Sequence, residues 1–317
     1  MPTKKCLAAA AQEHAMKLGP CLDVVSAFRR ACDWEVRARK IGNVHDEAAF
    51  VDMSAADLRR SAAVAAPLLQ EVGRRGVGPT VLAAVRRRRR VTPVNTNLGI
   101  LLLTVPLAAV PRPVGVHGAA WLRRGVRGVL RRLSVADAVA VYQAIRLARP
   151  GGLGRVARAD VNSRPRLTLL SAMKLAARRD GVARQYANGF ADLWRTGLPA
   201  LRFALRRGWP LEEAILLCQL RLLARLGDSL IARKCGRAVS RQLRRRATAV
   251  LAAGWPATGR SQRLLARLDH WLRAEGHRRN PGTTADLVTA TLFAAGRCGL
   301  LPSSDASFRS PRILVSC

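Results

Sequence analysis

Apolar residues recur at helical spacing along most of this chain, and short loops marked by Gly and Pro separate the segments. In residues 134–152 apolar side chains return every three or four positions. Ser134 and Asp137 have the spacing of a capping box, and a Pro-Gly-Gly sequence ends the segment. We find no run of alternating β-branched residues bounded by turns, so strands should be few or absent. The chain is therefore predicted to be all-α.

Three further segments support this prediction. Residues 53–73 have Ser54 as a candidate N-cap, and residues 209–227 open with Pro210, which suits the first turn of a helix. Residues 98–110 are apolar almost throughout, but about 13 residues are too few to cross a bilayer. We expect a buried helix there, no membrane contact, and one domain of roughly ten or more helices.

The length and composition set the domain organisation that we expect. With 317 residues, 49% of them hydrophobic, the chain can bury a sizeable core, and no long linker separates two halves. We predict an N-terminal extension over residues 1–20, one helical domain over residues 21–300, and a Ser-rich C-terminal tail over residues 301–317.

The chain is strongly basic, with 55 Lys and Arg against 20 Asp and Glu and a net charge of +35. This balance predicts attraction to anions, although the excess is spread widely enough to fit a compositional preference for arginine. A nonspecific nucleic-acid contact is favoured most by five consecutive arginines, Arg86, Arg87, Arg88, Arg89 and Arg90. Aromatic residues are only 4%, which disfavours a dedicated nucleic-acid-binding protein. If these five arginines lie in one helix, their side chains point to all sides of it. At least one must then extend its guanidinium to the surface or pair with a polar group inside the protein.

The seven cysteines are scattered, form no CxxC pair and are odd in number. This pattern argues against a disulfide framework or a structural zinc site and favours a reducing compartment. Polar residues interrupt the apolar run near the N-terminus too early for a signal peptide. We therefore expect a cytoplasmic protein.

Four loop-like stretches carry unusual polar residues, namely residues 34–46, 92–99, 227–236 and 277–288. Three of them contain candidate helix caps. Asp228 can cap a helix that starts at Ser229, Asn95 or Thr96 can cap the apolar helix, and Asn280 before Pro281 suits an N-cap followed by a first-turn proline. If these helix starts converge, their N–H groups and partial positive charge make a phosphate site.

Carboxylates are scarce in this chain, so Glu35, Asp228 and Asp286 stand out within these stretches. Mg²⁺ prefers one or two carboxylates together with phosphate oxygens and water. The stretches therefore predict a phosphate site that uses Mg²⁺.

In their order along the chain, these motifs resemble those of the triphosphoribosyl-dephospho-CoA synthase family. That family carries a Glu ahead of a Lys-Pro-Gly segment, an Asn-Thr motif before an apolar helix, a His-bearing helix followed by Asp-Ser or Asp-Thr, and a late Asn-Pro-Gly-x-x-Ala-Asp. The counterparts here are Glu35 with RKIGNVH (39–45), NTNLG (95–99), DSLIARK (228–234) and NPGTTADL (280–287). The similarity extends over residues 22–298 and takes in residues 144–156 and 182–190.

The resemblance implies a helical transferase that uses ATP as a ribosyl donor. The 2′-hydroxyl of 3′-dephospho-CoA would attack C1′ of the ATP ribose, adenine would leave, and the triphosphate would stay on the product, a prosthetic-group precursor. This chemistry needs a carboxylate for an oxocarbenium-like sugar, a base for the hydroxyl, and Mg²⁺ with cationic donors for the triphosphate.

The resemblance also implies roles for individual residues. Asp228 and Asp286 are predicted to bind Mg²⁺ or act as the base, and Glu35 to contact the ribose or the metal. His45 is a further candidate acid or base, although a lone histidine in a loop is more often structural. Contacts to ATP and its phosphates are predicted for Lys40, Asn43, Asn95, Thr96, Arg233, Lys234, Asn280 and Gly282.

Three departures from the family pattern leave alternatives open. Ile41 stands where the family usually has Pro, Gln219 stands where a His is expected, and NTNLG lacks the His and Lys of an Asn-Thr-His-Lys-Gly form. The chain is thus expected to lie in a divergent branch, with another acceptor or a reduced activity. The alternatives are a related ATP-dependent enzyme that builds a phosphoribosyl cofactor of pterin-based one-carbon metabolism, and a basic nucleic-acid-binding protein.

Overall fold

The computed structural model describes residues 19–302 and residue 308. Within these residues the chain forms fifteen α-helices, a short π-helical turn and one four-residue strand, which confirms the predicted all-α fold. In chain order the elements are α2 (Val24–Arg37), α3 (Ala55–Gln70), α4 (Val72–Arg75), α5 (Val77–Arg89), α6 (Leu98–Ala108), α7 (Ala120–Arg131), α8 (Val135–Ala148), α9 (Leu169–Ala176), α10 (Gly181–Asn188), η1 (Leu193–Gly197), α11 (Leu198–Arg206), α12 (Leu211–Leu226), α13 (Ser229–Cys235), α14 (Arg237–Ala252), α15 (Gly259–Arg273), β1 (Ala274–His277) and α16 (Gly282–Arg297).

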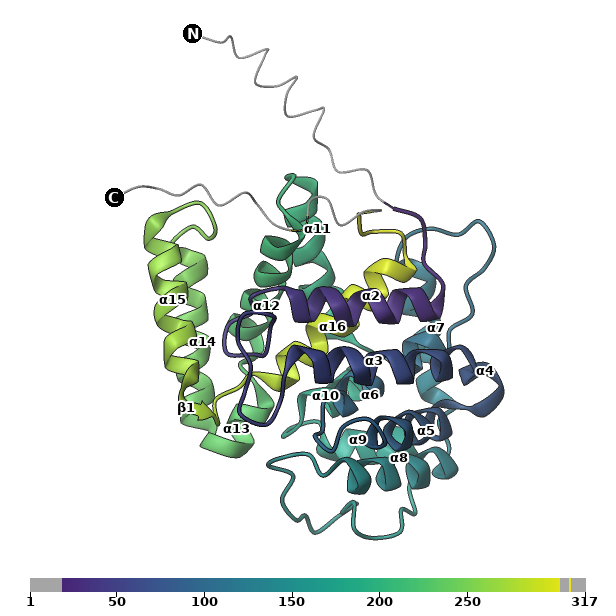
Figure 1. Cartoon of the computed structure of the whole chain (residues 1–317). Helices are drawn as coiled ribbons and strands as arrows, with labels where there is room; N and C mark the ends of the chain where they lie inside the picture. Colours follow the sequence, from purple (N-terminus) through teal and green to yellow (C-terminus); the bar gives the residue numbers. More distant parts are fainter. Residues whose placement is uncertain (1–18, 303–307, 309–317) are drawn as a thin grey trace.

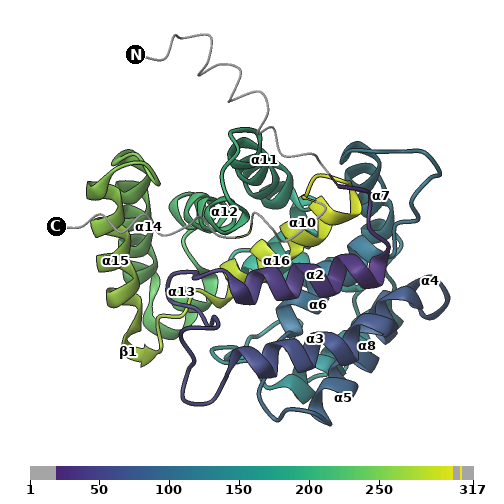
Figure 2. The ribbon, with the colours of Figure 1, turned by 45° about the horizontal axis from the view of Figure 1, so that its top comes forward.

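The helix α16 runs through the middle of the helical body, with the other helices around it (Figures 1 and 2). It contacts α2, α6, α10, α12 and α13. Thirteen of its sixteen residues are buried, and most of them are Ala, Thr, Leu, Val or Phe. A helix without a polar face is stable only when it is enclosed on all sides. The first turns of α16, which carry Asp286, therefore lie inside the molecule.

The helices α14 and α15 form a pair at one edge of the body, where they pack on α12 and α13 (Figure 1). This pair has its own apolar cluster, which includes Leu243, Leu268 and Leu272. Ile41, from the loop after α2, is buried in the same cluster. The pair therefore fixes the loop that follows Glu35.

Several predicted helix starts are confirmed. Ser54 and Ser134 both form complete capping boxes, with Asp57 and Asp137 as the third residue of each helix. Asp228 caps α13 through hydrogen bonds to the Leu230 and Ile231 amides. Each of these side chains accepts a hydrogen bond from an amide in the first turn of a helix, where the amides have no acceptor within the helix. The bond therefore stabilises the start of the helix.

Two helix starts differ from the prediction. Pro210 occupies the N-cap position of α12 and not its first turn. Asn280 does not cap α16, because the helix begins at Gly282 with Pro281 in the N-cap position and no side-chain cap of its own. The physical reason is that Asp228, from another segment, accepts the hydrogen bond from the Thr284 amide in the first turn of α16.

The apolar segment after residue 97 is a buried helix, as predicted. Ten of the eleven residues of α6 are buried among the surrounding helices. No helix within the described part of the chain is both long enough and apolar enough to span a membrane.

The five consecutive arginines at the end of α5 differ in their exposure to solvent. Arg86, Arg87, Arg89 and Arg90 are exposed, whereas Arg88 is fully buried. Its Nη1 donates to the Val94 carbonyl at 2.7 Å, and its Nε and Nη2 have no hydrogen-bond partner. The prediction that one arginine of the run must pair is confirmed. The nucleic-acid contact suggested for the run stays a prediction.

The N-terminal extension and the C-terminal tail fall mostly outside the described residues. At their boundaries, the Gly19 amide donates to the Leu301 carbonyl at 2.7 Å. Phe308 is buried, and the Arg37 guanidinium lies 4.2 Å from the centre of its ring. Residues on both sides of the domain boundaries thus pack against the helical body.

Candidate active site

The four polar stretches meet at one cavity of about 260 Å³. Its walls come from the loop after α2, the start of α6, the segment from α8 to α10, α13 and the start of α16. Eight of the twelve predicted site residues line it: Glu35, Asn43, Asn95, Thr96, Arg233, Asn280, Gly282 and Asp286. The other four, Lys40, His45, Asp228 and Lys234, do not line it.

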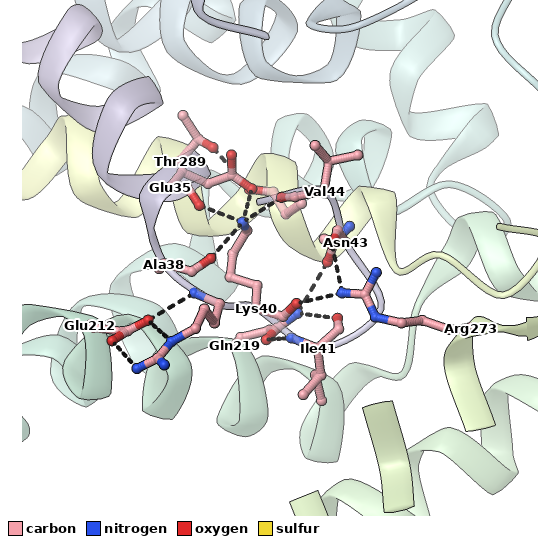
Figure 3. A network of polar contacts seen from close by, with 12 residues as sticks. Glu35, Ala38, Lys40, Ile41, Asn43, Val44, Glu212, Gln219, Arg273 and Thr289 are labelled. Atoms are coloured by element: carbon pink, nitrogen blue, oxygen red, sulfur yellow. Dashed lines mark hydrogen bonds and ion pairs between the residues drawn. The ribbon is translucent and has the colours of Figure 1, made fainter. Parts of the chain in front are cut away.

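Lys40 points into the protein rather than into the cavity (Figure 3). Its side chain is fully buried, and its Nζ lies 3.1 Å from Glu35 Oε1. The same Nζ donates to the carbonyl of Glu35 and, at 3.3 Å, to that of Val44. The Lys40 ammonium therefore joins the carbonyl groups at the two ends of this loop and also pairs with the Glu35 carboxylate. A phosphate contact for Lys40 stays a prediction that this arrangement does not favour.

The loop around Lys40 is clamped from three sides. Arg39 forms a two-pronged ion pair with Glu212 of α12, with both nitrogen–oxygen distances 2.8 Å. Gln219 accepts from the Ile41 amide at 3.1 Å and donates to the Ile41 carbonyl at 3.0 Å (Figure 3). Arg273 of α15 donates to the Asn43 carbonyl at 2.8 Å. With this many fixed points, the loop presents Glu35 and Asn43 at defined positions.

A glycine is required at the turn of this loop. Gly42 has a φ of +67°, a region that disfavours residues with a Cβ. A Cβ there would also come within 2.8 Å of Leu272 and 3.0 Å of Pro281. The close approach brings the loop after α2, α15 and the start of α16 together at one point.

Asp286 projects from α16 onto the first turn of α6. A Cβ added to Gly99 would lie 2.0 Å from Asp286 Oδ2, so the carboxyl group occupies the space that glycine leaves. No hydrogen bond or ion pair joins the Asp286 side chain to another described residue. The carboxyl group is therefore available to a ligand in the cavity. This contact joins the last of the four motifs, NPGTTADL, to the second, NTNLG.

Glu35 and Asp286 are the two predicted carboxyl groups that line the cavity. Burial raises the pKa of Asp286 well above its ordinary value, and the charges of Glu35, Asp228 and Asp180 raise it further. Burial also raises the pKa of Glu35, but the Lys40 ammonium opposes that rise. The two carboxyl groups thus differ in their neighbours, since only Glu35 has a buried cation beside it.

Asp228 is saturated with hydrogen bonds. Its Oδ1 accepts from the amides of Leu230 and Ile231 at 2.8 and 3.1 Å. Its Oδ2 accepts from the amide and the hydroxyl of Thr284, both at 2.8 Å. One carboxylate therefore caps α13 and α16 together. The catalytic and metal roles predicted for Asp228 stay predictions, and the four hydrogen bonds indicate a structural role instead.

The NTNLG segment is held by α3. Thr96 Oγ1 donates to Ser61 Oγ at 2.6 Å, and Asn97 Nδ2 donates to the Ser61 carbonyl at 3.4 Å. Asn95 Oδ1 accepts from the Leu98 amide at 3.3 Å. Asn97 Oδ1 is buried at the cavity wall without a hydrogen-bond partner. The sequence analysis gave Asn97 no role, although it lies in the motif and offers an acceptor to a ligand.

Of the two basic residues of α13, Arg233 lines the cavity and Lys234 does not. Arg233 lines the cavity and forms an ion pair with Asp180, with Nη1 and Oδ2 2.7 Å apart. Lys234 Nζ lies 3.5 Å from Asn280 Oδ1. Arg179 and Asp180 line the cavity as well, and the sequence analysis did not identify them. The signal for Asp180 is its position before Gly181, which matches the capping position of Asp228 before Ser229.

His45 lies behind the Lys40 loop. Its Nδ1 accepts from the Glu47 amide at 3.2 Å. Burial lowers its pKa to about 4, and the charges of Arg273 and Lys40 act in the same direction. The imidazole is therefore neutral at pH 7 and closes a turn. An acid or base role for His45 stays a prediction.

Part of the cavity lining is apolar, and none of these apolar residues was predicted from the sequence. The helices α8, α9 and α10 and the loop after α8 supply it with Tyr142, Ile145, Leu153, Leu169, Met173 and Val182. The Tyr142 hydroxyl donates to the Ala159 carbonyl at 2.9 Å and so ties the loop to α8. The cavity thus combines apolar residues with carboxyl and guanidinium groups, which suits a ligand with a flat base and an anionic end.

Residues 21–303 match the family described as ATP:dephospho-CoA triphosphoribosyl transferase, CitG. The chain belongs to this family. Over 113 residues it is 35% identical to 2-(5''-triphosphoribosyl)-3'-dephosphocoenzyme-A synthase of Klebsiella pneumoniae, a match that covers 36% of this chain and 40% of that protein. The chain therefore matches less than half the length of this curated relative.

A solved CitG-like structure extends the comparison to the fold. A protein from Archaeoglobus fulgidus assigned as a triphosphoribosyl-dephospho-CoA synthase superposes with a TM-score of 0.56 at 27% sequence identity. The superposition covers 74% of this chain and 96% of that one. The helical body described above is thus shared across almost the whole of that protein.

The departures of this CitG-family chain from the expected motif are structurally coupled. Gln219 binds both the amide and the carbonyl of Ile41, and its Nε2 also donates to Asn43 Oδ1 at 3.1 Å. A proline at position 41 has no N–H to donate. Ile41 and Gln219 therefore form one alternative way to fix the loop, and both side chains are buried.

Proposed function

We propose that this chain transfers the triphosphoribosyl group of ATP to the 2′-hydroxyl of 3′-dephospho-CoA and releases adenine. Membership of the CitG family supports this proposal. The observation that carries it is that the carboxyl groups of Glu35 and Asp286 share one cavity with apolar residues and with two arginines, Arg179 and Arg233. The proposed substrates, ATP and a coenzyme A precursor, are consistent with the cytoplasmic location that we expect from the sequence.

The proposed step breaks the C1′–N9 bond of ATP and forms a C1′–O bond to the acceptor. Adenine gains a proton and the attacking hydroxyl loses one, so the step needs both an acid and a base. Asp286, whose raised pKa favours the protonated form, gives its proton to the departing adenine. Glu35, paired with Lys40, stabilises the positive charge on the sugar and takes up the hydroxyl proton.

The other residues of the cavity would bind the adenine, the ribose hydroxyls and the phosphates of ATP. The apolar wall formed by α8, α9 and α10 receives the adenine ring. Asn95, Asn97 and Asn280 lie where they can bind ribose hydroxyls, and Arg233 binds phosphate once it leaves Asp180. Thr96 serves mainly to hold the loop, because its hydroxyl already bonds to Ser61.

Mg²⁺ fits this site only together with phosphate. Among residues 19–302 and 308, no group of three or more His, Cys, Asp and Glu side chains is arranged to hold a metal ion. Three carboxyl groups, Glu35, Asp180 and Asp286, do line the cavity, and Mg²⁺ commonly takes one or two carboxylates with phosphate oxygens and water. Asp228 is less suited, because all its lone pairs face protein donors. Bound Mg²⁺ would neutralise part of the triphosphate charge.

The test is to incubate the protein with ATP, Mg²⁺ and dephospho-CoA and to measure free adenine by chromatography. We expect adenine release only when both substrates are present. Asp286→Asn should lower the rate by about 10²–10⁴-fold, the range for loss of an acid–base group. Full adenine release by Asp286→Asn would remove its proposed role. No release by the wild type would instead favour another acceptor or an inactive relative.

A further inference from the structure

A second cavity of about 200 Å³ lies behind the first. It is enclosed by the turn before α10, the loop between α12 and α13, the start of α14 and the start of α16. Four residues line both cavities: Arg179, Asp180, Arg233 and Thr283. The two cavities therefore adjoin at the ion pair between Asp180 and Arg233.

The second cavity carries an excess of positive charge. Five arginines line it, Arg178, Arg179, Arg184, Arg233 and Arg237, against two aspartates, Asp180 and Asp228. Asp228 accepts four hydrogen bonds from backbone and hydroxyl donors, so it neutralises none of these arginines directly. Asp180 pairs with Arg233, and Arg184 pairs with Asp192, which does not line the cavity, so Arg178, Arg179 and Arg237 have no carboxylate partner among the described residues. The lining residues alone thus leave a net attraction for anions.

Several of these cationic groups have unused hydrogen-bonding capacity. The side chains of Arg178 and Arg237 are exposed and form no hydrogen bond or ion pair with any residue of the described chain. Arg233 Nε is buried without a partner, although its Nη1 bonds to Asp180. Guanidinium groups match phosphate oxygens with two parallel hydrogen bonds. Arginines on separate elements would therefore suit a ligand with several phosphates.

We propose that the second cavity binds a polyphosphate chain whose sugar end lies in the first cavity. This proposal rests on the proposed function. The second cavity would hold the phosphates of a substrate whose sugar is bound beside Asp286 in the first cavity. Entry of the chain replaces the Asp180–Arg233 ion pair with a contact between Arg233 and phosphate. Two substrates carry such a group, namely the triphosphate of ATP and the diphosphate of dephospho-CoA.

The direct test uses inorganic tripolyphosphate and isothermal titration calorimetry. The double variant Arg178→Gln/Arg237→Gln removes two exposed arginines from the cavity wall. Arg241→Gln/Arg245→Gln is the matched control, since it removes the same charge from exposed positions on α14 outside the cavity. We expect tripolyphosphate affinity to fall by about tenfold or more in the first variant, from the loss of charge-assisted hydrogen bonds, and to change by less than about twofold in the control.

Two results would overturn the proposal. One is an equal loss of affinity in both double variants, which would mean that only the overall charge attracts the anion. The other is no measurable binding of tripolyphosphate to the wild type. Because all four substituted positions are exposed, melting temperatures within about 2 °C of the wild type should show that each variant is folded.

Substrate kinetics then identify the source of the phosphates. A rise in KM for ATP alone in Arg178→Gln/Arg237→Gln assigns the cavity to the triphosphate, and a rise in KM for dephospho-CoA alone assigns it to the diphosphate. An unchanged KM for both substrates in an active variant would contradict a substrate role even if tripolyphosphate binds. If the wild type releases no adenine but tripolyphosphate binding follows the expected pattern, the subsite stands and the proposed function fails.

Discussion

Asp228 Oδ2 accepts hydrogen bonds from both the amide and the hydroxyl of Thr284, at 2.8 Å each, although the two residues are 56 positions apart. Its other oxygen caps α13. One buried carboxylate thus fixes the angle between α13, which carries Arg233, and α16, which carries Asp286. The geometry of the first cavity depends on Asp228, although Asp228 lines only the second cavity.

Asp228→Ala should destabilise the protein more than the loss of a single cap. We expect the free energy of unfolding in urea to fall by about 2–4 kcal/mol, since one cap is worth about 1 kcal/mol and the buried Thr284 donors lose their acceptor. Ser134→Ala, which removes one capping box, is the comparison and should cost about 1 kcal/mol. Equal losses in the two variants would show that the bonds to Thr284 contribute nothing.

Gly99→Ala should displace the Asp286 carboxyl group, because the added Cβ would lie 2.0 Å from Oδ2. We expect adenine release to fall by at least about tenfold and stability by about 1–2 kcal/mol. Gly73→Ala in α4 is the control, because nothing lies within 4 Å of that position. Gly99→Ala combined with Asp286→Ala should regain the stability but not the activity. If Gly99→Ala keeps full activity, the contact does not position Asp286.

Asp286→Asn should make the protein more stable at neutral pH. The pKa of Asp286 in the folded state is raised above the ordinary 3.8 of the unfolded chain. The stability that the neutral carboxyl contributes is therefore present below about pH 4 and is lost as pH rises through the folded pKa. Asparagine does not titrate, so the difference in melting temperature between variant and wild type should grow from pH 4 towards neutral pH. A constant difference across this range would contradict the raised pKa.

Lys40→Met should leave the Glu35 carboxylate buried without its cation. Removing one partner of a buried ion pair typically costs about 3–5 kcal/mol, and we expect a loss in that range. Without Lys40 the pKa of Glu35 rises further, so the loss should be smaller at low pH, where Glu35 is protonated, than at pH 8. Glu35→Gln combined with Lys40→Met should recover part of the stability. Strictly additive losses in urea unfolding would show that the two groups do not interact.

His45→Gln should leave the pH dependence of adenine release unchanged between pH 6 and 8. The pKa of His45 lies at about 4, so the imidazole is neutral throughout this range. The rate of release as a function of pH is the measurement, with Asp286→Asn as the variant that should alter it. Loss of an inflection near pH 6.5 in His45→Gln would assign His45 an acid–base role after all.

Helix starts could be predicted where the capping side chain is close in sequence. Ser54, Ser134 and Asp228 each bond to an amide two or three residues ahead. The start of α16 could not be predicted in the same way, because its cap comes from Asp228 through the folded structure. From the sequence, Asn280 was the expected cap of α16, because it is the nearest capping residue ahead of the helix. In the structure Asp228, 56 positions before Thr284, accepts from the Thr284 amide instead.

The motifs were enough to place Glu35, Asn95 and Asp286 around one cavity, but not to show which way each side chain of a loop points. Lys40 is the clearest example. Its ammonium is turned inward to Glu35, a contact that depends on the path of the loop and not on the local sequence. The apolar wall from α8 to α10 was missed for another reason, since apolar residues at helical spacing look the same whether they face a core or a ligand.

The central position of α16 has a consequence for biosynthesis. The ribosome completes α2 and α6 long before it reaches α16, yet both of these helices pack on α16. Until α16 emerges, the nascent chain exposes the apolar faces that this helix covers, and such surfaces promote aggregation. The helix that carries Asp286 is therefore also the one that closes the core, so an incomplete chain lacks the fold and the reactive carboxyl group together.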